Sequence, residues 1–122
     1  MNDLTGLQAQ RDFDVTDADT AAALGSGTVG VLGTPRLLAW LEAATVSALD
    51  GRLGDGETSV GTRVDLKHRK PSAVGSTVRC AAEVTGHDGR KLEFRATAHA
   101  DDGTLLAEAA IHRAIVDESA FA

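Results

Sequence analysis

Glu42 is a carboxylate in the middle of an otherwise mostly apolar stretch, TPRLLAWLEAATVSAL (residues 34–49). At 100° per residue it lies on the same helix face as Leu38 and Val46. An ionised carboxylate in apolar surroundings costs several kcal/mol unless it is paired or hydrogen-bonded. Such a glutamate is therefore protonated, paired through hydrogen bonds or an opposite charge, or functional. The Thr34 hydroxyl, two turns earlier, adds a second reactive group.

His68 is a titratable residue at the end of a strand-like stretch, SVGTRVDLKH. Alternation with a period of two places it on the same face as Val60 and Val64, toward the core. Glu42 and His68 are then both directed inward and can satisfy each other as an acid/base pair. The plainer alternatives are a Glu42 side chain that reaches a wet cleft or subunit contact, and a hydrogen-bonded histidine at a strand end.

Three other motifs do not support a cofactor or metal site. GSGTVG (25–30) matches a dinucleotide fingerprint in letters but lacks the strand before it and the βαβ unit around it, so we interpret it as a flexible loop that gates substrate. The four histidines and the single cysteine show no metal-ligand spacing. Cys80 is in phase with Val78 and Val84, which predicts a core side chain.

The predicted elements are one long helix and an antiparallel sheet, an α+β fold. The helix spans 35–50, with Thr34 as its N-cap, Pro35 as its first residue and Gly51 as its stop. A short strand at 11–15 and a short helix or loop precede it. From residue 58 onward the period changes to two. The strands are predicted at 58–68, 76–86, 90–101 and 104–116.

Alternation also predicts the register of the hairpins. A three-residue loop at 87–89 places Val84 opposite Leu92 and keeps the core residues on one face. A two-residue turn at 102–103 then pairs the next two strands. Because the helix is apolar on many sides, we expect the sheet to wrap round it or a second subunit to cover the remainder.

The overall composition predicts a single domain over residues 1–122 of a cytoplasmic protein. The length suits one core. The net charge of −6, without a basic patch, argues against nucleic acid as a partner. The N-terminus lacks a signal-peptide pattern and no run of 18 apolar residues suggests a membrane segment. One cysteine fits a reducing compartment.

From about residue 29 to 116 the sequence resembles the hotdog-fold thioesterases, in particular the subgroup typified by fluoroacetyl-CoA thioesterase. The most specific parts are the Thr-x₇-Glu spacing on the helix and the VGT strand before a histidine. The resemblance implies an antiparallel sheet curled around one long central helix, usually as a homodimer with active sites at the subunit interface. It also implies hydrolysis of an acyl-CoA thioester without a metal or other cofactor, coenzyme A being part of the substrate.

Carried over residue by residue, the family's catalytic groups fall on Thr34, Glu42 and His68, and its glycine near the thioester falls on Gly61. Glu42 then acts either as general base on water or as a nucleophile that forms a transient anhydride; the sequence leaves both open. Thr34 orients Glu42 or hydrogen-bonds the thioester. His68 stabilises the leaving thiolate or delivers a proton to it, and backbone N–H groups near Gly61 meet the oxyanion.

Three basic residues flank the histidine, and two departures from the family stand elsewhere in the chain. Lys67, Arg69 and Lys70 are predicted to meet the phosphates of coenzyme A, the alternative being an ordinary solvated strand end. The family's aromatic-rich lid corresponds here to GSGTVGVLG, so we do not expect specificity for a fluorinated substrate. In the family's His-Glu-Arg run near the C-terminus only Arg113 is comparable.

Two rival functions remain open from the sequence. A hotdog enoyl-CoA hydratase or dehydratase would use the same acid/base pair to add or remove water. A non-catalytic acyl-CoA or small-ligand binding protein would bind without turnover. The acyl group is not specified by the sequence.

Overall fold

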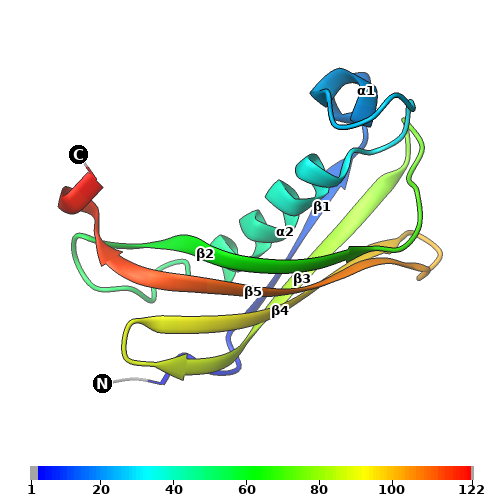
Figure 1. Cartoon of the computed structure of the whole chain (residues 1–122). Coiled ribbons are helices and arrows are strands. Elements are labelled where there is room, and N and C mark those ends of the chain that lie inside the picture. The colour runs from blue at the N-terminus through cyan, green and yellow to red at the C-terminus, as the bar shows by residue number, and fades with distance from the viewer. Residues whose placement is uncertain (1–2, 122) are drawn as a thin grey trace.

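The computed structural model describes residues 3–121 as one five-stranded antiparallel sheet with one long helix lying across it (Figure 1). The strands follow the order β1-β3-β4-β5-β2, so that β1 and β2 form the two edges. No helix within this described part is long and apolar enough to cross a membrane. The elements in chain order are β1 (Gln8–Asp14), the 3-10 helix η1 (Asp17–Asp19), α1 (Ala21–Leu24), α2 (Thr34–Ala48), β2 (Glu57–His68), β3 (Thr77–Asp88), β4 (Lys91–Ala100), β5 (Leu105–Asp117) and the 3-10 helix η2 (Glu118–Phe121).

The long helix α2 begins differently from the prediction. Gly33, with extended backbone angles (φ −77°, ψ 142°), is the N-cap, so the prediction of Thr34 as the cap is wrong. The Gly33 carbonyl accepts from the N–H groups of Arg36 and Leu37. Thr34 is already inside the first turn, and its hydroxyl is therefore left for a contact outside the helix.

One side of α2 is packed against β1, β3 and β4, where the hydrophobic core lies. Leu37, Leu41 and Ala44 are fully buried there, against inward residues of the sheet such as Phe94 and Val78. Each fully buried leucine contributes about 1.5–3 kcal/mol through removal of apolar surface from water. This side fixes the helix on the sheet.

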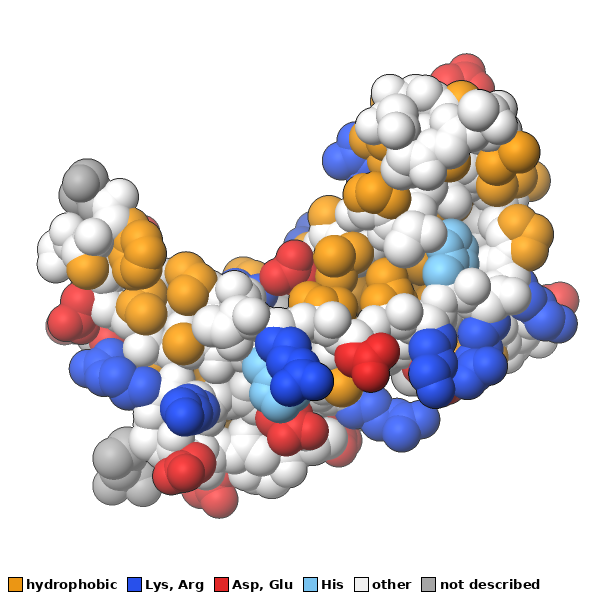
Figure 2. Space-filling view, in the orientation of Figure 1, with side chains coloured by type: hydrophobic (Ala, Val, Ile, Leu, Met, Phe, Trp, Pro, Cys, Tyr) orange, Lys and Arg blue, Asp and Glu red, His pale blue; other side chains and the backbone are white. Residues whose placement is uncertain are grey.

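The other side of α2 stays open. Thr34 is exposed, Leu38 and Glu42 are half-buried, and Val46 is 52% exposed. Figure 2 shows this face hollowed, with hydrophobic side chains gathered over α2 in the hollow. The sheet therefore covers the apolar helix from one side only, and the face that carries Glu42 is accessible.

The β3–β4 hairpin contains a bulge that the alternation argument did not include. The strands are joined by a tight turn at 89–90, and Val84 lies opposite Phe94 instead of Leu92. Thr85 is unpaired, because the register shifts between residues 84 and 86. This extra residue keeps core side chains on one face despite the short turn, so the predicted three-residue loop at 87–89 is wrong.

The β4–β5 hairpin pairs as predicted in its middle but not at its turn. Phe94 lies opposite Ile111, and the following core pairs match the prediction. A register shift after Ala98 makes the connection a three-residue loop at 101–103, in place of the predicted two-residue turn. The glycine in this loop has a φ of 87°, a left-handed conformation that glycine adopts without strain.

A third bulge, at Thr62 in β2, shapes the site described below. Gly61 pairs with Arg113, the next pair begins one residue beyond Thr62, and Thr62 itself has no residue opposite it on β5 in the strand register. The bulge inverts the alternation, so that Ser59 and Gly61 face α2 while Val60 faces away. The predicted inward direction of Val60 is therefore wrong, whereas the last residues of the strand alternate as predicted.

Candidate active site

The first pair of polar residues joins the N-terminus of α2 to the end of β2. Thr34 Oγ1 lies 2.8 Å from His68 Nδ1, a hydrogen bond whose donor depends on the tautomer of the ring. His68 Nε2 is buried and has no hydrogen-bond partner within residues 3–121. Burial lowers the pKa of His68 below its ordinary value of 6.5, although the backbone of Lys70 acts in the opposite direction. His68 is therefore predominantly neutral at pH 7.

A neutral His68 can serve Thr34 in two ways. If Nδ1 carries no proton, the Thr34 hydroxyl donates to it and the ring can draw the hydroxyl proton away. If Nδ1 carries the proton, the ring donates to Oγ1 and leaves a threonine lone pair oriented. Both tautomers fit the contact between Thr34 and His68. In both, the imidazole lies at the N-terminal end of α2, beside the open face of the helix.

The second pair is Glu42 on α2 and Arg113 on β5. Arg113 Nη1 donates to Glu42 Oε2 over 3.2 Å. The arginine side chain is 7% exposed and the glutamate side chain is 34% exposed, so the cation is enclosed while the carboxylate reaches the open face. Burial lowers the pKa of Arg113 and the Glu42 charge opposes this, but an arginine remains charged.

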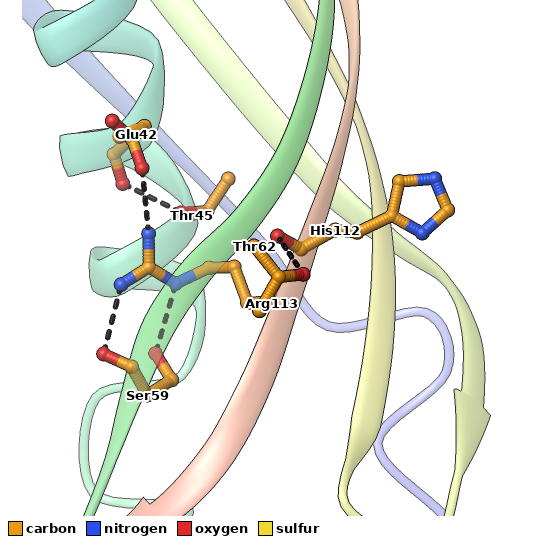
Figure 3. Close-up of polar contacts among 6 residues, drawn as sticks. All are labelled: Glu42, Thr45, Ser59, Thr62, His112 and Arg113. Atoms are coloured by element: carbon orange, nitrogen blue, oxygen red, sulfur yellow. Dashed lines mark hydrogen bonds and ion pairs between the residues drawn. The ribbon is translucent and has the colours of Figure 1, made fainter.

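Ser59 holds the other side of the Arg113 guanidinium (Figure 3). Arg113 Nε donates to Ser59 Oγ and Nη2 donates to the Ser59 backbone carbonyl, each over 2.9 Å. The arginine thus lies between β2 and α2 with three of its nitrogens bound. The Glu42 carboxylate therefore accepts a charge-assisted hydrogen bond from a cation whose own position is fixed, and this bond orients the carboxylate.

Gly61 lies directly beneath the carboxylate. A Cβ added to this residue would overlap Glu42 Oε2 and would lie 3.7 Å from Arg113 Nη1. Gly61 does not have a positive φ, so the space taken by Glu42, and not backbone conformation, is what requires a glycine here. The predicted association of Gly61 with the site thus has a physical basis in its contact with Glu42.

The structure brings the predicted residues together in two groups instead of one. Thr34 contacts His68, and Glu42 contacts Arg113 above Gly61. Within residues 3–121 there is no hydrogen bond between Glu42 and His68, so these two do not satisfy each other as the sequence suggested. Thr34 and Glu42 are eight residues apart on one face of α2, about 12 Å along its axis.

Arg113 and Ser59 were not predicted as site residues. Arg113 was recoverable in part, because it continues the inward alternation of Ile111 and Ile115 on the last strand and a buried arginine needs a partner. Ser59 was not recoverable, since its direction depends on the unpaired Thr62.

The basic residues at the end of β2 are exposed, beside His68. Arg69 Nη2 donates to Glu108 Oε1 over 2.9 Å, and this contact together with the arginine charge lowers the pKa of Glu108. Lys67 and Lys70 are exposed at the same strand end. The cluster is therefore partly neutralised, but its two lysines face solvent.

Other candidates for chemistry carry little weight. Within the described residues no group of three or more histidine, cysteine or carboxylate side chains is arranged to hold a metal ion. Cys80 is fully buried, and burial raises the pKa of its thiol to about 12, so it is not a thiolate nucleophile at neutral pH. GSGTVG lies in the irregular connection between α1 and α2, and the strands around it are antiparallel, without a βαβ unit.

Comparison with known proteins places the chain in a family. The family described as FlK, fluoroacetyl-CoA-specific thioesterase, matches residues 15–119. A curated fluoroacetyl-CoA thioesterase from Streptantibioticus cattleyicolor is 35% identical over 69 residues. This match covers 57% of the present chain and 50% of the relative, so the chain spans about half the length of that curated protein.

Solved structures agree with the fold. An alanine mutant of the fluoroacetyl-CoA-specific thioesterase FlK, in complex with fluoroacetate and CoA, matches with a TM-score of 0.89 at 27% identity, over 100% of both chains. A thioesterase superfamily member from Thermus thermophilus matches with a TM-score of 0.90 at 23% identity, over 99% of this chain and 90% of that one. The present chain therefore has the hotdog fold and belongs to the fluoroacetyl-CoA-specific thioesterase family.

Proposed function

We propose that this chain hydrolyses acyl-CoA thioesters to the free acid and coenzyme A at the open face of α2. One observation carries the proposal: the Glu42 carboxylate is hydrogen-bonded to the buried Arg113, yet the Glu42 side chain is still one-third exposed on that face. Family membership supports the reaction class, because the relatives are named thioesterases. Structures of the FlK relative with CoA and fluoroacetate, and of a threonine-to-serine mutant with acetyl-CoA, support a CoA ester as substrate.

Glu42 is the group we assign to the attack on the thioester carbonyl. Only Oε2 is bound to Arg113, and Oε1 has no hydrogen bond within residues 3–121, so Oε1 is the oxygen available for chemistry. As general base it takes a proton from water while the hydroxide adds to the carbonyl and the thiolate leaves. As nucleophile it adds to the carbonyl itself, expels the thiolate and forms an anhydride that water then hydrolyses.

Thr34 and His68 are assigned to the leaving-group side of the reaction. Their mutual hydrogen bond holds the imidazole at the N-terminal end of α2, where a neutral ring can stabilise the departing thiolate by donating a hydrogen bond to it. Backbone N–H groups near Gly61 remain our candidates for stabilising the oxyanion.

We further propose a homodimer in which a second copy of this chain covers the open face. The edge strand β2 pairs on one side only, with β5, and α2 exposes Val46 on the open face. A second copy would bury both. We assign the CoA phosphates to Lys67, Arg69 and Lys70, and we place the protein in the cytoplasm, with residues 1–122 as one domain.

The test is a panel of acyl-CoA esters with acyl chains from two to twelve carbons, monitored for free thiol and for free acid. Thiol and acid released in equal amounts support the proposal. Addition of water to an enoyl-CoA without release of thiol, or saturable binding of every ester without turnover, would contradict it. A panel is needed because no aromatic lid residue in the 25–33 loop restricts the acyl group.

A further inference from the structure

Ser59 is the residue on which the Arg113 guanidinium is held. Its hydroxyl accepts from Nε and its backbone carbonyl accepts from Nη2, both over 2.9 Å. Two acceptors on one residue fix the plane of the guanidinium, which has its five N–H donors in a rigid fork. Once that plane is fixed, the remaining Nη1 can point in only one direction, toward Glu42.

The Ser59 hydroxyl faces Arg113 because of the bulge at Thr62. In a regular strand, Ser59 and Gly61 would lie on the opposite face from Val64, which packs inward. The unpaired Thr62 restores both to the inner face, with its own hydroxyl donating to the His112 carbonyl over 3.2 Å. One bulge thus places the acceptor for Arg113 and the open space for the carboxylate two residues apart on one strand.

We propose that Ser59 is a positioning residue for thioester hydrolysis, acting through Arg113 to hold the Glu42 carboxylate over Gly61, a role that presupposes the thioesterase activity proposed above. Loss of the hydroxyl leaves the Arg113 Nε–H without an acceptor in a site where the side chain is 7% exposed. A buried charged donor that is left unpaired carries the full cost of its lost hydration. The guanidinium then rotates toward another acceptor and releases Glu42 from its orientation.

The kinetic experiment compares Ser59→Ala, Ser59→Thr and the control Thr58→Ala in the full chain. Thr58 pairs with Val116 and lies on the other face of β2, so its variant removes a hydroxyl without touching Arg113. Because a hydrogen bond to a charged group is involved, we expect Ser59→Ala to lower kcat about tenfold with KM within about twofold. Ser59→Thr, which keeps the hydroxyl, and Thr58→Ala should retain kcat within about threefold of wild type.

A double variant shows whether the effect passes through Arg113. In an Arg113→Lys background the guanidinium is gone, so we expect Ser59→Ala to lower kcat by less than about twofold further. A Ser59→Ala variant with wild-type kcat would overturn the proposal. So would an undiminished tenfold loss in the Arg113→Lys background, or a failure of threonine to restore kcat.

A second readout separates this proposal from the thioesterase proposal. The ¹⁵N resonance of the Arg113 Nε–H group, identified by its loss in Arg113→Lys, reports on the hydrogen bond without any turnover. We expect it to be protected from solvent exchange in wild type, Ser59→Thr and Thr58→Ala, and to broaden in Ser59→Ala. If wild type hydrolyses no ester, the function proposed above fails, and an unchanged resonance in Ser59→Ala overturns the role of Ser59 itself.

Discussion

Gly61→Ala is the substitution that changes the orientation of the Glu42 carboxylate while leaving Glu42 itself in the chain. The new methyl group would overlap Glu42 Oε2, while the backbone angles of residue 61 suit alanine. The carboxylate is the far end of a flexible side chain, so it can move aside and the fold need not change. Every side chain that we assign to the reaction is still present in the variant, but we expect Glu42 to be displaced from Arg113.

The size of the effect follows from the distance that Glu42 must move. To reach an ordinary van der Waals separation from the new methyl group, the carboxylate oxygen retreats by roughly 1 Å. A misplacement of about 1 Å at a reacting group costs about 100-fold in rate. The loss of the glycine's backbone freedom in the unfolded chain stabilises the variant by about 0.4–1 kcal/mol, which offsets part of the weakened ion pair.

We therefore expect kcat/KM for thiol release to fall about 100-fold, with a free energy of unfolding within about 1 kcal/mol of wild type. Gly86→Ala is the matched control, because its Cβ would lie at an ordinary 3.7 Å from the Glu93 Cβ and its φ is not positive. This control should retain wild-type activity. Wild-type activity in Gly61→Ala would refute the account of Glu42, and a large loss of stability would show that the effect is not one of orientation.

Three further outcomes follow from the other residues. Thr34→Val removes the hydroxyl bound to His68 and should lower kcat about tenfold, with little change in stability because Thr34 is exposed; unchanged kcat would exclude Thr34 from the reaction. The lowered pKa of His68 means that the folded state favours neutral imidazole, so its contribution to stability is fully present above pH 6.5 and is lost as the pH falls below it. Wild type should therefore lose more free energy of unfolding between pH 7 and 5 than His68→Gln, and equal losses would contradict the burial of His68. The Cys80 thiol, with a pKa of about 12, should not react with a disulfide reagent at pH 8 until the protein is unfolded. Rapid labelling of the native protein would contradict its burial.

Much of the fold could be predicted because its elements have strong periodicity. The long helix ends close to its predicted boundary, and the four strands after residue 57 match the predicted strands within about two residues, as is usual for such boundaries. The register of the strands was harder to predict, because each of the three bulges adds one residue that the alternation of apolar and polar residues does not reveal. At Val84 and Val60 a regular strand was the simplest interpretation, and in both places an unpaired threonine follows shortly after.

The candidate site was predictable in its residues but not in its pairing. Glu42 is predictable because it is a charge on an apolar helix, and Thr34 and His68 are predictable from their spacing and phase. The partner of Glu42 could not be found, because Arg113 is 71 residues away and reaches it only through the pairing of β2 with β5. The contact between Thr34 and His68 depended on Gly33 being the helix cap, which leaves the threonine hydroxyl unused by the helix.

The central claim is that Glu42 carries out the attack on an acyl-CoA thioester. The most direct measurement is the release of free thiol from short acyl-CoA esters by wild type and by Glu42→Ala, with circular dichroism and thermal unfolding to confirm that both are folded. We predict turnover by wild type and loss of more than about 100-fold in the variant, the scale of a lost acid/base group. Turnover by a folded Glu42→Ala variant close to that of wild type would contradict the claim.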